Sequence, residues 1–145
     1  MDANSHTKQN IRQTVPFFMI TEMDRSLQFY VQGLGFEMKN KWTPNGKIEW
    51  CWLQREGAAV MLQEYKTEIT KEILGKLGEG VSICFQCEDA LKLYLEFLSK
   101  GLNPEQPFVG NGMWDVHIND PDGYVLHFES VTDVPEETKY SKWKK

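Results

Sequence analysis

The two halves of this 145-residue sequence resemble each other, and this internal duplication constrains the fold more than any other feature. In the first half, apolar residues follow the i, i+3, i+4, i+7 spacing of one helix face, and a matching set recurs 64 positions later. The matching positions are Leu27, Tyr30, Val31 and Leu34 in the first half and Leu91, Tyr94, Leu95 and Leu98 in the second. The same offset carries Gly46 to Gly110 and Trp50 to Trp114. Because flanking turns and strands match as well, we interpret the chain as a duplication, not as two unrelated helices that match by chance.

Each half predicts the same order of elements: a strand, a helix and three further strands. Alternating apolar and polar residues predict the strands, and a glycine after each helix predicts its end. In the first half, strands are predicted at 13–20, 36–42, 47–54 and 58–64, with a helix at 23–34. In the second half, strands are predicted at 81–87, 113–118 and 124–130, with a helix at 90–100 and an extended or looped stretch at 104–107. A short helix is a further candidate at 70–77. The pattern predicts an α+β protein built from two βαβββ modules.

The length fits a single domain, since domains average roughly 150 residues. We expect this domain at 13–130, with module 1 at about 13–65 and module 2 at about 81–130. We predict that residues 1–12, which include His6, form a flexible arm. Residues 131–145 predict a polar C-terminal tail that lies on the surface, with Tyr140 and Trp143 docked.

The net charge and the cysteine content limit which binding partners and which cellular compartment we expect for this protein. The chain has 16 Lys and Arg against 21 Asp and Glu, a net charge of −5, whereas nucleic-acid-binding surfaces are normally basic. No stretch approaches the ~20 apolar residues of a membrane span, and the first ten residues lack the apolar run of a secretory signal. The odd number of cysteines favours reduced thiols, and the Cys84 and Cys87 side chains, three apart on a predicted strand, point to opposite faces. We therefore expect a cytoplasmic protein that binds neither nucleic acid nor membrane.

Strand alternation divides the predicted sheet residues into two faces. One face is uniformly apolar and suits packing under the helices: Phe18, Ile20, Val60, Leu62, Ile83, Phe85, Leu126 and Phe128. The other is mixed: Val15, Phe17, Met19, Ala59, Met61, Gln63, Ser82, Cys84, Gln86, Val125, His127 and Glu129. The mixed face is either simply solvated or part of a ligand-binding surface. Its large aromatic and sulfur-containing side chains favour a ligand-binding surface, because a solvated sheet face does not need them.

Both ends of this region resemble a known superfamily. Residues 15–36 (VPFFMITEMDRSLQFYVQGLGF) resemble the opening of the vicinal-oxygen-chelate superfamily, which includes glyoxalases, bleomycin-resistance proteins and extradiol dioxygenases. Residues 120–129 (DPDGYVLHFE) resemble its closing signature, so the resemblance covers about residues 13–130. It implies that the two βαβββ modules form a cupped, incomplete mixed β-barrel with flanking helices. It also implies a frequent homodimer whose sites are often shaped by both chains.

The resemblance places four metal-ligand positions on the cupped face, two from each module. These positions fall on Val15, Met61 (or Leu62, if the register slips by one), Ser82 and His127. Valine cannot bind a divalent ion, methionine does not suit a hard or borderline one, and serine is a poor ligand. His117 lies on a strand of module 2 but, counted back from the Asp-Pro-Asp-Gly turn, not at a ligand position. We therefore expect no cofactor and no divalent metal.

Without a metal, the chain most resembles the bleomycin-resistance-like branch. We expect metal-independent binding or sequestration of a small aromatic or amphipathic molecule such as an antibiotic. The expected ligand-binding residues are Phe17, Met19, Trp50, Trp52, Met61, Gln63, Ser82, Cys84, Trp114 and His127, with Trp42 nearby, and no catalytic residue is identified. Aromatic faces stack on planar rings and attract cations, and Glu49, Asp115 and Glu129 would favour a cationic ligand.

Other functions stay open at this point. A divergent metal-dependent glyoxalase-like lyase, isomerase or dioxygenase would need His127 with Gln63, Glu129 or groups from a partner chain. A pair of Cys84 and His127 would permit thiol chemistry if the thiolate were stabilised. His127 would otherwise be a hydrogen-bonding or structural histidine. A sensor or interaction module is a further alternative for which the sequence offers no specific feature.

Overall fold

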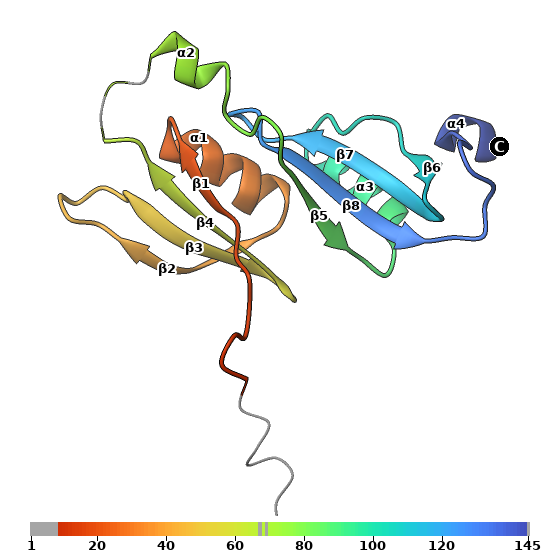
Figure 1. Cartoon of the computed structure of the whole chain (residues 1–145), viewed down its shortest axis with the longest axis horizontal. Helices are drawn as coiled ribbons and strands as arrows, with labels where there is room; N and C mark the ends of the chain where they lie inside the picture. Colours follow the sequence, from red (N-terminus) through yellow and green to blue (C-terminus); the bar gives the residue numbers. More distant parts are fainter. Residues whose placement is uncertain (1–8, 67, 69, 145) are drawn as a thin grey trace, which may run out of the picture.

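Each half of the chain forms a four-stranded mixed sheet. The computed structural model describes residues 9–66, 68 and 70–144 (Figure 1). Sheet A has the order β1-β4-β3-β2 and sheet B the order β5-β8-β7-β6; β1 pairs in parallel with β4 and β5 with β8, and the other pairs are antiparallel. The strands are β1 (Phe17–Ile20), β2 (Glu37–Trp42), β3 (Trp50–Arg55), β4 (Ala58–Glu64), β5 (Ser82–Gln86), β6 (Phe108–Gly110), β7 (Met113–Asn119) and β8 (Val125–Val131). The arrangement confirms the predicted α+β class and the two βαβββ modules, which form a cupped sheet and, over the described residues, no closed barrel.

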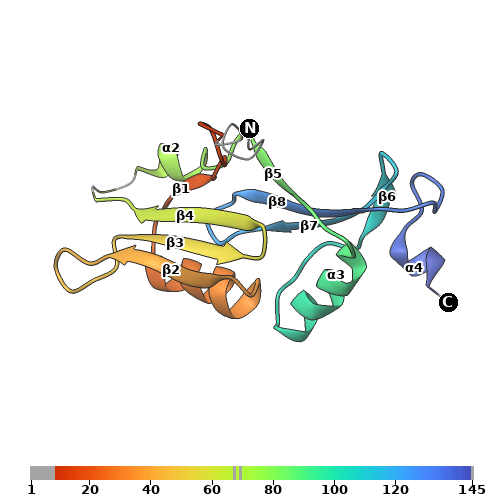
Figure 2. The same ribbon diagram turned by 90° about the horizontal axis from the view of Figure 1, so that it is seen from below.

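The main helices lie on one side of both sheets, which sit side by side (Figure 2). The helical segments are α1 (Met23–Leu27), η2 (Gln28–Gly33), α2 (Lys71–Leu74), α3 (Ala90–Ser99) and α4 (Tyr140–Trp143). The helix predicted at 23–34 is thus α1 followed by a π-helical stretch, in which the Leu34 N–H bonds the Phe29 carbonyl at 2.8 Å. No helix among the described residues is long and apolar enough to cross a bilayer.

Several boundaries differ from those predicted. Strand β4 matches its predicted range, but β1 begins four residues later than expected, after Pro16, which has no N–H to donate. The short strand β6 was not predicted, because its three residues show no alternation to detect. Residues 1–8 of the predicted arm, including His6, positions 67 and 69 near the predicted 70–77 helix, and Lys145 lie outside the described residues.

The hydrophobic core lies between the helices and the apolar faces of the two sheets. The predicted apolar face of module 1 is buried, with Ile20, Val60 and Leu62 fully inaccessible to solvent. In module 2, Leu126 is fully buried, and Phe128 stacks on Phe85 with ring centroids 4.7 Å apart. Burial of one strand face against helices leaves the opposite faces of both sheets open.

The Asp-Pro-Asp-Gly turn of module 2 fixes the two modules to each other. Within the turn, one Asp120 oxygen accepts hydrogen bonds from the backbone N–H groups of Asp122 and Tyr124, both at 2.9 Å. Its other oxygen accepts the hydroxyl of Tyr30 in module 1 at 2.9 Å. Burial, and then the charge of Asp120, raise the pKa of Tyr30 well above its usual value, so the phenol stays protonated and donates. Asp122 in turn accepts from the Thr21 N–H at 3.1 Å and from its hydroxyl at 2.6 Å.

A second link between the modules joins β3 to α3. The Arg55 guanidinium donates to both Glu96 carboxylate oxygens, at 2.7 and 3.0 Å, and to the Leu34 carbonyl at 2.7 Å. This hydrogen-bonded pairing lowers the pKa of Glu96. Two parallel N–H···O bonds make this the strong, directional form of an ion pair.

We predict a pH-dependent coupling between Arg55 and Glu96. In a double-mutant cycle with Arg55→Met and Glu96→Gln, the coupling free energy should be about 0.5–1 kcal/mol at pH 7, since both groups are partly exposed. Because the folded-state pKa of Glu96 is lowered, its contribution is present above the unfolded pKa of about 4.3 and is lost as the pH falls through the folded-state value. Urea unfolding at pH 7 and pH 3 measures this coupling, and an equal coupling at both pH values would contradict the pairing.

Candidate functional site

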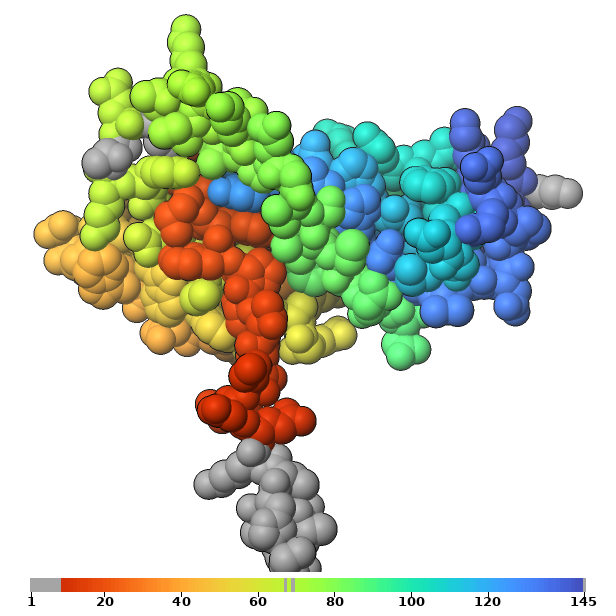
Figure 3. Space-filling view, in the orientation of Figure 1, coloured from red at the N-terminus to blue at the C-terminus, as the bar shows by residue number. Residues whose placement is uncertain are grey.

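The open faces of the two sheets have different chemistry and form the candidate site. Both face the viewer in Figure 1, and Figure 3 shows the same side as a surface. We call the open side of sheet A the aromatic face: Phe17, Met19, Trp42, Trp50, Trp52, Met61 and Gln63. We call the open side of sheet B the polar face: Ser82, Cys84, Gln86, Asp115, His117, His127 and Glu129. All the predicted ligand-binding residues except Trp114 lie on these two faces.

Strand register arranges the aromatic face in two rows across sheet A. One row runs Trp52, Met61, Phe17, and the other runs Trp42, Trp50, Gln63, Met19. Phe17 is 46% exposed and Trp42 is 47% exposed, so this surface is only partly covered by the chain itself. At the edge of the face, the Lys66 ammonium lies 4.7 Å from the centroid of the Trp42 ring. An apolar, aromatic surface of this kind can bind a planar molecule or another protein surface.

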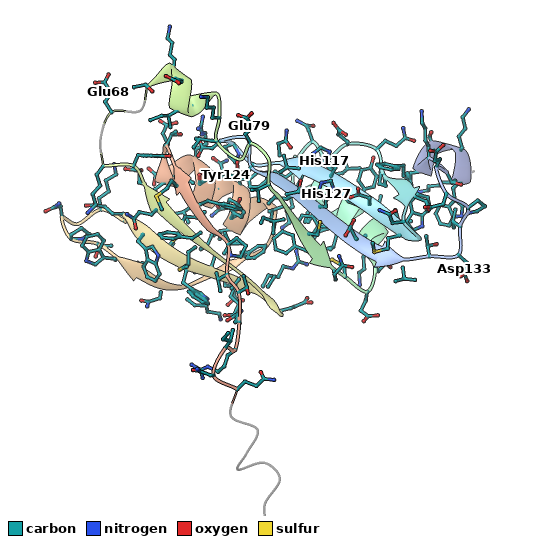
Figure 4. All side chains as sticks on the ribbon, viewed as in Figure 1. Glu68, Glu79, His117, Tyr124, His127 and Asp133 are labelled. Atoms are coloured by element: carbon teal, nitrogen blue, oxygen red, sulfur yellow. The ribbon has the colours of Figure 1, made fainter. Side chains whose placement is uncertain are left out.

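Two stacked histidines, His117 and His127, lie at the centre of the polar face, and each is held by other polar side chains. The His127 Nδ1 lies 2.9 and 3.1 Å from the two Asp115 carboxylate oxygens. The His127 ring stacks on that of His117, with centroids 4.9 Å apart and planes inclined by 19° (Figure 4). His117 is in turn held by Asn119, whose Oδ1 lies 3.0 Å from Nε2, and by Glu105, whose carboxylate lies 3.3 Å from Nδ1. The pair therefore has a fixed orientation on the sheet.

The remaining polar-face side chains surround His127. Cys84 is its direct neighbour on β5 in the parallel register. Partial burial, followed by the charges of Glu129 and Asp115, raises the pKa of the Cys84 thiol. Glu129 lies opposite Asp115 on the neighbouring strand and accepts a hydrogen bond from the Gln86 amide at 2.8 Å. A thiol with a raised pKa is a poor nucleophile at neutral pH, which disfavours the thiol chemistry considered above.

Three of the four positions that correspond to metal ligands carry residues that are poor ligands for a divalent ion. Met61 is on the open face, whereas Leu62 is fully buried in the core, which resolves the alternative register. Val15 precedes β1 and Ser82 begins β5 on the open side, so His127 is the one strong donor among the four. Across the residues described, no group of three or more His, Cys, Asp or Glu side chains is arranged to hold a metal.

The structure corrects the predicted position of Trp114. Its side chain is 4% exposed and lies on the helix side of β7, where its ring centroid is 5.3 Å from that of Trp143. The offset of 64 inferred from the sequence fails in this strand: the open-face residue that matches Trp50 is Asp115, 65 positions later, not Trp114. An offset that is wrong by one residue assigns every side chain of a strand to the opposite face. The tail prediction holds here, since Tyr140 and Trp143 both dock against Trp114.

The sequence analysis missed His117 as a member of the site. The ladder between β7 and β8 places His117 opposite His127, so both rings share the open face. Pairing the two strands that flank the Asp-Pro-Asp-Gly turn as a hairpin would have placed His117 opposite His127. Glu49 precedes β3, lies 3.8 Å from the Lys66 ammonium and lines the same hollow as Trp42, so it is near the edge of the aromatic face.

Two hollows in the described part of the chain lie away from the predicted ligand-binding residues, since none of those residues lines either of them. One, of about 550 Å³, lies between the modules and is lined by Thr21, Glu22, Arg25, Tyr65, Leu74, Pro121 and Asp122. The other, of about 490 Å³, lies at the end of sheet A and is lined by Trp42, Pro44, Asn45, Lys47, Glu49, Glu64, Tyr65 and Lys66. The candidate site in the single chain is therefore a pair of open sheet faces.

Comparison with known families agrees with this geometry. The family model of the Glyoxalase/Bleomycin resistance protein/Dioxygenase superfamily matches residues 11–128. The chain belongs to this superfamily. A search of curated protein sequences finds no match.

Several solved structures are similar in fold to this chain at low sequence identity. TioX from Micromonospora sp. ML1 is 18% identical, with a TM-score of 0.65 over 83% of this chain and 99% of TioX. UcmS2 is 17% identical, with a TM-score of 0.68 over 83% of this chain and 98% of UcmS2. TnmS3, an antibiotic binding protein from Streptomyces sp. CB03234, is 15% identical, with a TM-score of 0.64 over 86% of this chain and 99% of TnmS3. At these identities the likeness establishes the fold.

We predict that the cysteines react slowly at neutral pH. Burial raises the pKa of Cys51 to about 11, and the pKa values of Cys84 and Cys87 are raised as well. Because a raised pKa leaves little thiolate at pH 7, iodoacetamide should label even the exposed Cys84 more slowly than free cysteine, and the rate should rise as the pH passes 9. Mass spectrometry of the wild type and of a Cys84→Ser control measures this. Labelling of Cys84 at pH 7 faster than that of free cysteine would restore thiol chemistry as a candidate function.

Proposed function

We propose that this protein binds and sequesters a small, planar aromatic or amphipathic molecule with a positive charge, such as an antibiotic, without a metal. The observation that carries the proposal is the aromatic face, and three residues of poor metal-binding chemistry at the metal-ligand positions, Val15, Met61 and Ser82, support it. TnmS3, which shares the fold, is an antibiotic binding protein, and this supports the proposal by analogy. We place the function in the cytoplasm, in keeping with three free cysteines.

The aromatic face suits a flat, cationic ligand. Trp50 and Trp52 lie two residues apart on β3, so their rings project from the same side of the sheet. Offset stacking on such rings stabilises a planar ligand, and an indole ring also attracts a cation. The Lys66 ammonium over the Trp42 ring supports binding of a cation at this surface.

An enclosed site would require a second copy of the chain. The open faces of the two sheets point the same way and lie side by side, so neither covers the other (Figure 2). A pocket that buries most of a ligand needs opposing walls. In the proposed homodimer, the aromatic face of one protomer lies opposite the polar face of its partner, and each of two equivalent sites receives residues from both chains.

Binding of planar antibiotics should be saturable and should depend on the aromatic face. We expect titration with bleomycin and other planar cationic antibiotics to quench tryptophan fluorescence, and calorimetry to give a matching Kd. Trp52→Ala should weaken binding at least tenfold, because it removes one stacking ring worth roughly 0.5–1.5 kcal/mol together with its buried area. Trp143→Ala is the matched control, since Trp143 lies against Trp114 on the helix side. If none of the antibiotics binds saturably, drug sequestration is wrong.

The second candidate is a metal-dependent lyase, isomerase or dioxygenase. One observation favours it: His127 lies on the open face with Glu129 two residues away, and Gln63 lies on the neighbouring open face. Metal analysis of protein purified without chelator separates the two functions. We expect no stoichiometric Zn, Ni, Mn or Fe; a bound metal that is lost in His127→Ala would favour the enzyme.

A further inference from the structure

The Asp115–His127 pair leaves one ring nitrogen of His127 without a partner among the described residues. Both Asp115 oxygens lie within 3.1 Å of Nδ1, and a carboxylate can only accept a hydrogen bond, so Nδ1 carries the proton. In the neutral ring, the proton on Nδ1 makes Nε2 a hydrogen-bond acceptor. By the covalent structure of imidazole, Nε2 is also the nitrogen farther from the backbone. It therefore lies at the outer end of a side chain on the open face.

The surroundings hold His127 in this state. Its ring stacks on His117, and the Asp115 side chain is only 13% exposed, so neither partner is free to turn. The His127 side chain is 21% exposed, which leaves part of the ring accessible from the open side. Asp115 therefore acts as a positioning residue for His127, much as a buried carboxylate selects the histidine tautomer in other sites.

The polar face has two carboxylates, Asp115 and Glu129, on neighbouring strands. The four strands of sheet B, all of them described, contain no Lys or Arg. Asp115 and Glu129 lie directly opposite each other in the ladder, an arrangement of like charges that costs stability in a sheet. A ligand that donates a hydrogen bond and carries a positive charge would satisfy Nε2 and offset this repulsion.

From this geometry we infer that His127 is a ligand-binding residue whose Nε2 accepts a hydrogen bond from an N–H group of a cationic aromatic amine, with Asp115 as its positioning residue. This inference rests on the proposed binding function and specifies the ligand class. The ring of the ligand stacks on the aromatic face and its N–H group meets the polar face. No proton is transferred, since the bond forms between a neutral imidazole and the protonated amine.

Two planar cations test this assignment: 9-aminoacridine, which has N–H donors, and 10-methylacridinium, which has none. At pH 8, wild type should bind 9-aminoacridine about tenfold more tightly than 10-methylacridinium, as expected for one hydrogen bond to a charged group. His127→Phe should abolish this preference, because phenylalanine keeps a ring but has no acceptor. His127→Gln should retain part of it through the amide oxygen, and Trp143→Ala should leave it unchanged. Ligand fluorescence gives both Kd values, and circular dichroism confirms that each variant is folded.

The tautomer of His127 provides a readout that needs no ligand. Nitrogen-15 NMR of the histidine rings should show His127 protonated on Nδ1 and bare on Nε2 in the wild type, and Asp115→Asn should change that distribution. A wild-type ring protonated on Nε2 alone overturns the inference. So does equal affinity for the two acridines, which leaves the proposed binding function intact. If neither acridine binds, the proposed function fails for planar cations, and this inference fails with it.

Discussion

The Asp-Pro-Asp-Gly turn is the contact on which the rest of the structure depends. Asp120 accepts hydrogen bonds from its own turn and from the buried Tyr30 hydroxyl of module 1, while Asp122 accepts from Thr21. A segment of module 2 thereby completes the hydrogen bonding of module 1, and Tyr124 extends this by donating to the Met19 carbonyl at 2.7 Å. Because these groups are largely buried, loss of one partner would leave another unsatisfied at a cost of about 1–3 kcal/mol. The turn therefore fixes the sheets side by side with their open faces on the same side.

Duplication explains how one fold supplies two kinds of surface. The helix-facing residues of both modules are apolar, since each module must bury its sheet against a helix. The open faces have no such requirement, and they differ: Trp52 in module 1 lies where module 2 has His117, and Met61 lies where module 2 has His127. One module thus contributes stacking surface and the other contributes hydrogen-bond acceptors. A site that receives both can discriminate by ring shape and by polar group.

The sequence predicted the fold well, because hydrophobic periodicity follows from burial. Alternation placed β4 at its observed bounds and correctly separated Met61 from the buried Leu62. The assumed offset of 64 failed for Trp114, because the matching strands are 65 positions apart and a shift of one residue reverses the face of a side chain. Alternation also overlooked the stacking of His117 on His127, which depends on the ladder between β7 and β8. Side-chain pairs across strands are set by register, and register is not visible in either strand alone.

The most direct test of this account is a crystal structure of the protein with 9-aminoacridine bound. The account predicts a homodimer in which the acridine ring lies against Trp50 and Trp52 of one protomer, with a ligand nitrogen within hydrogen-bond distance of a His127 Nε2. A ligand seated instead in the hollow beside Arg25 and Tyr65, away from both open faces, would contradict it.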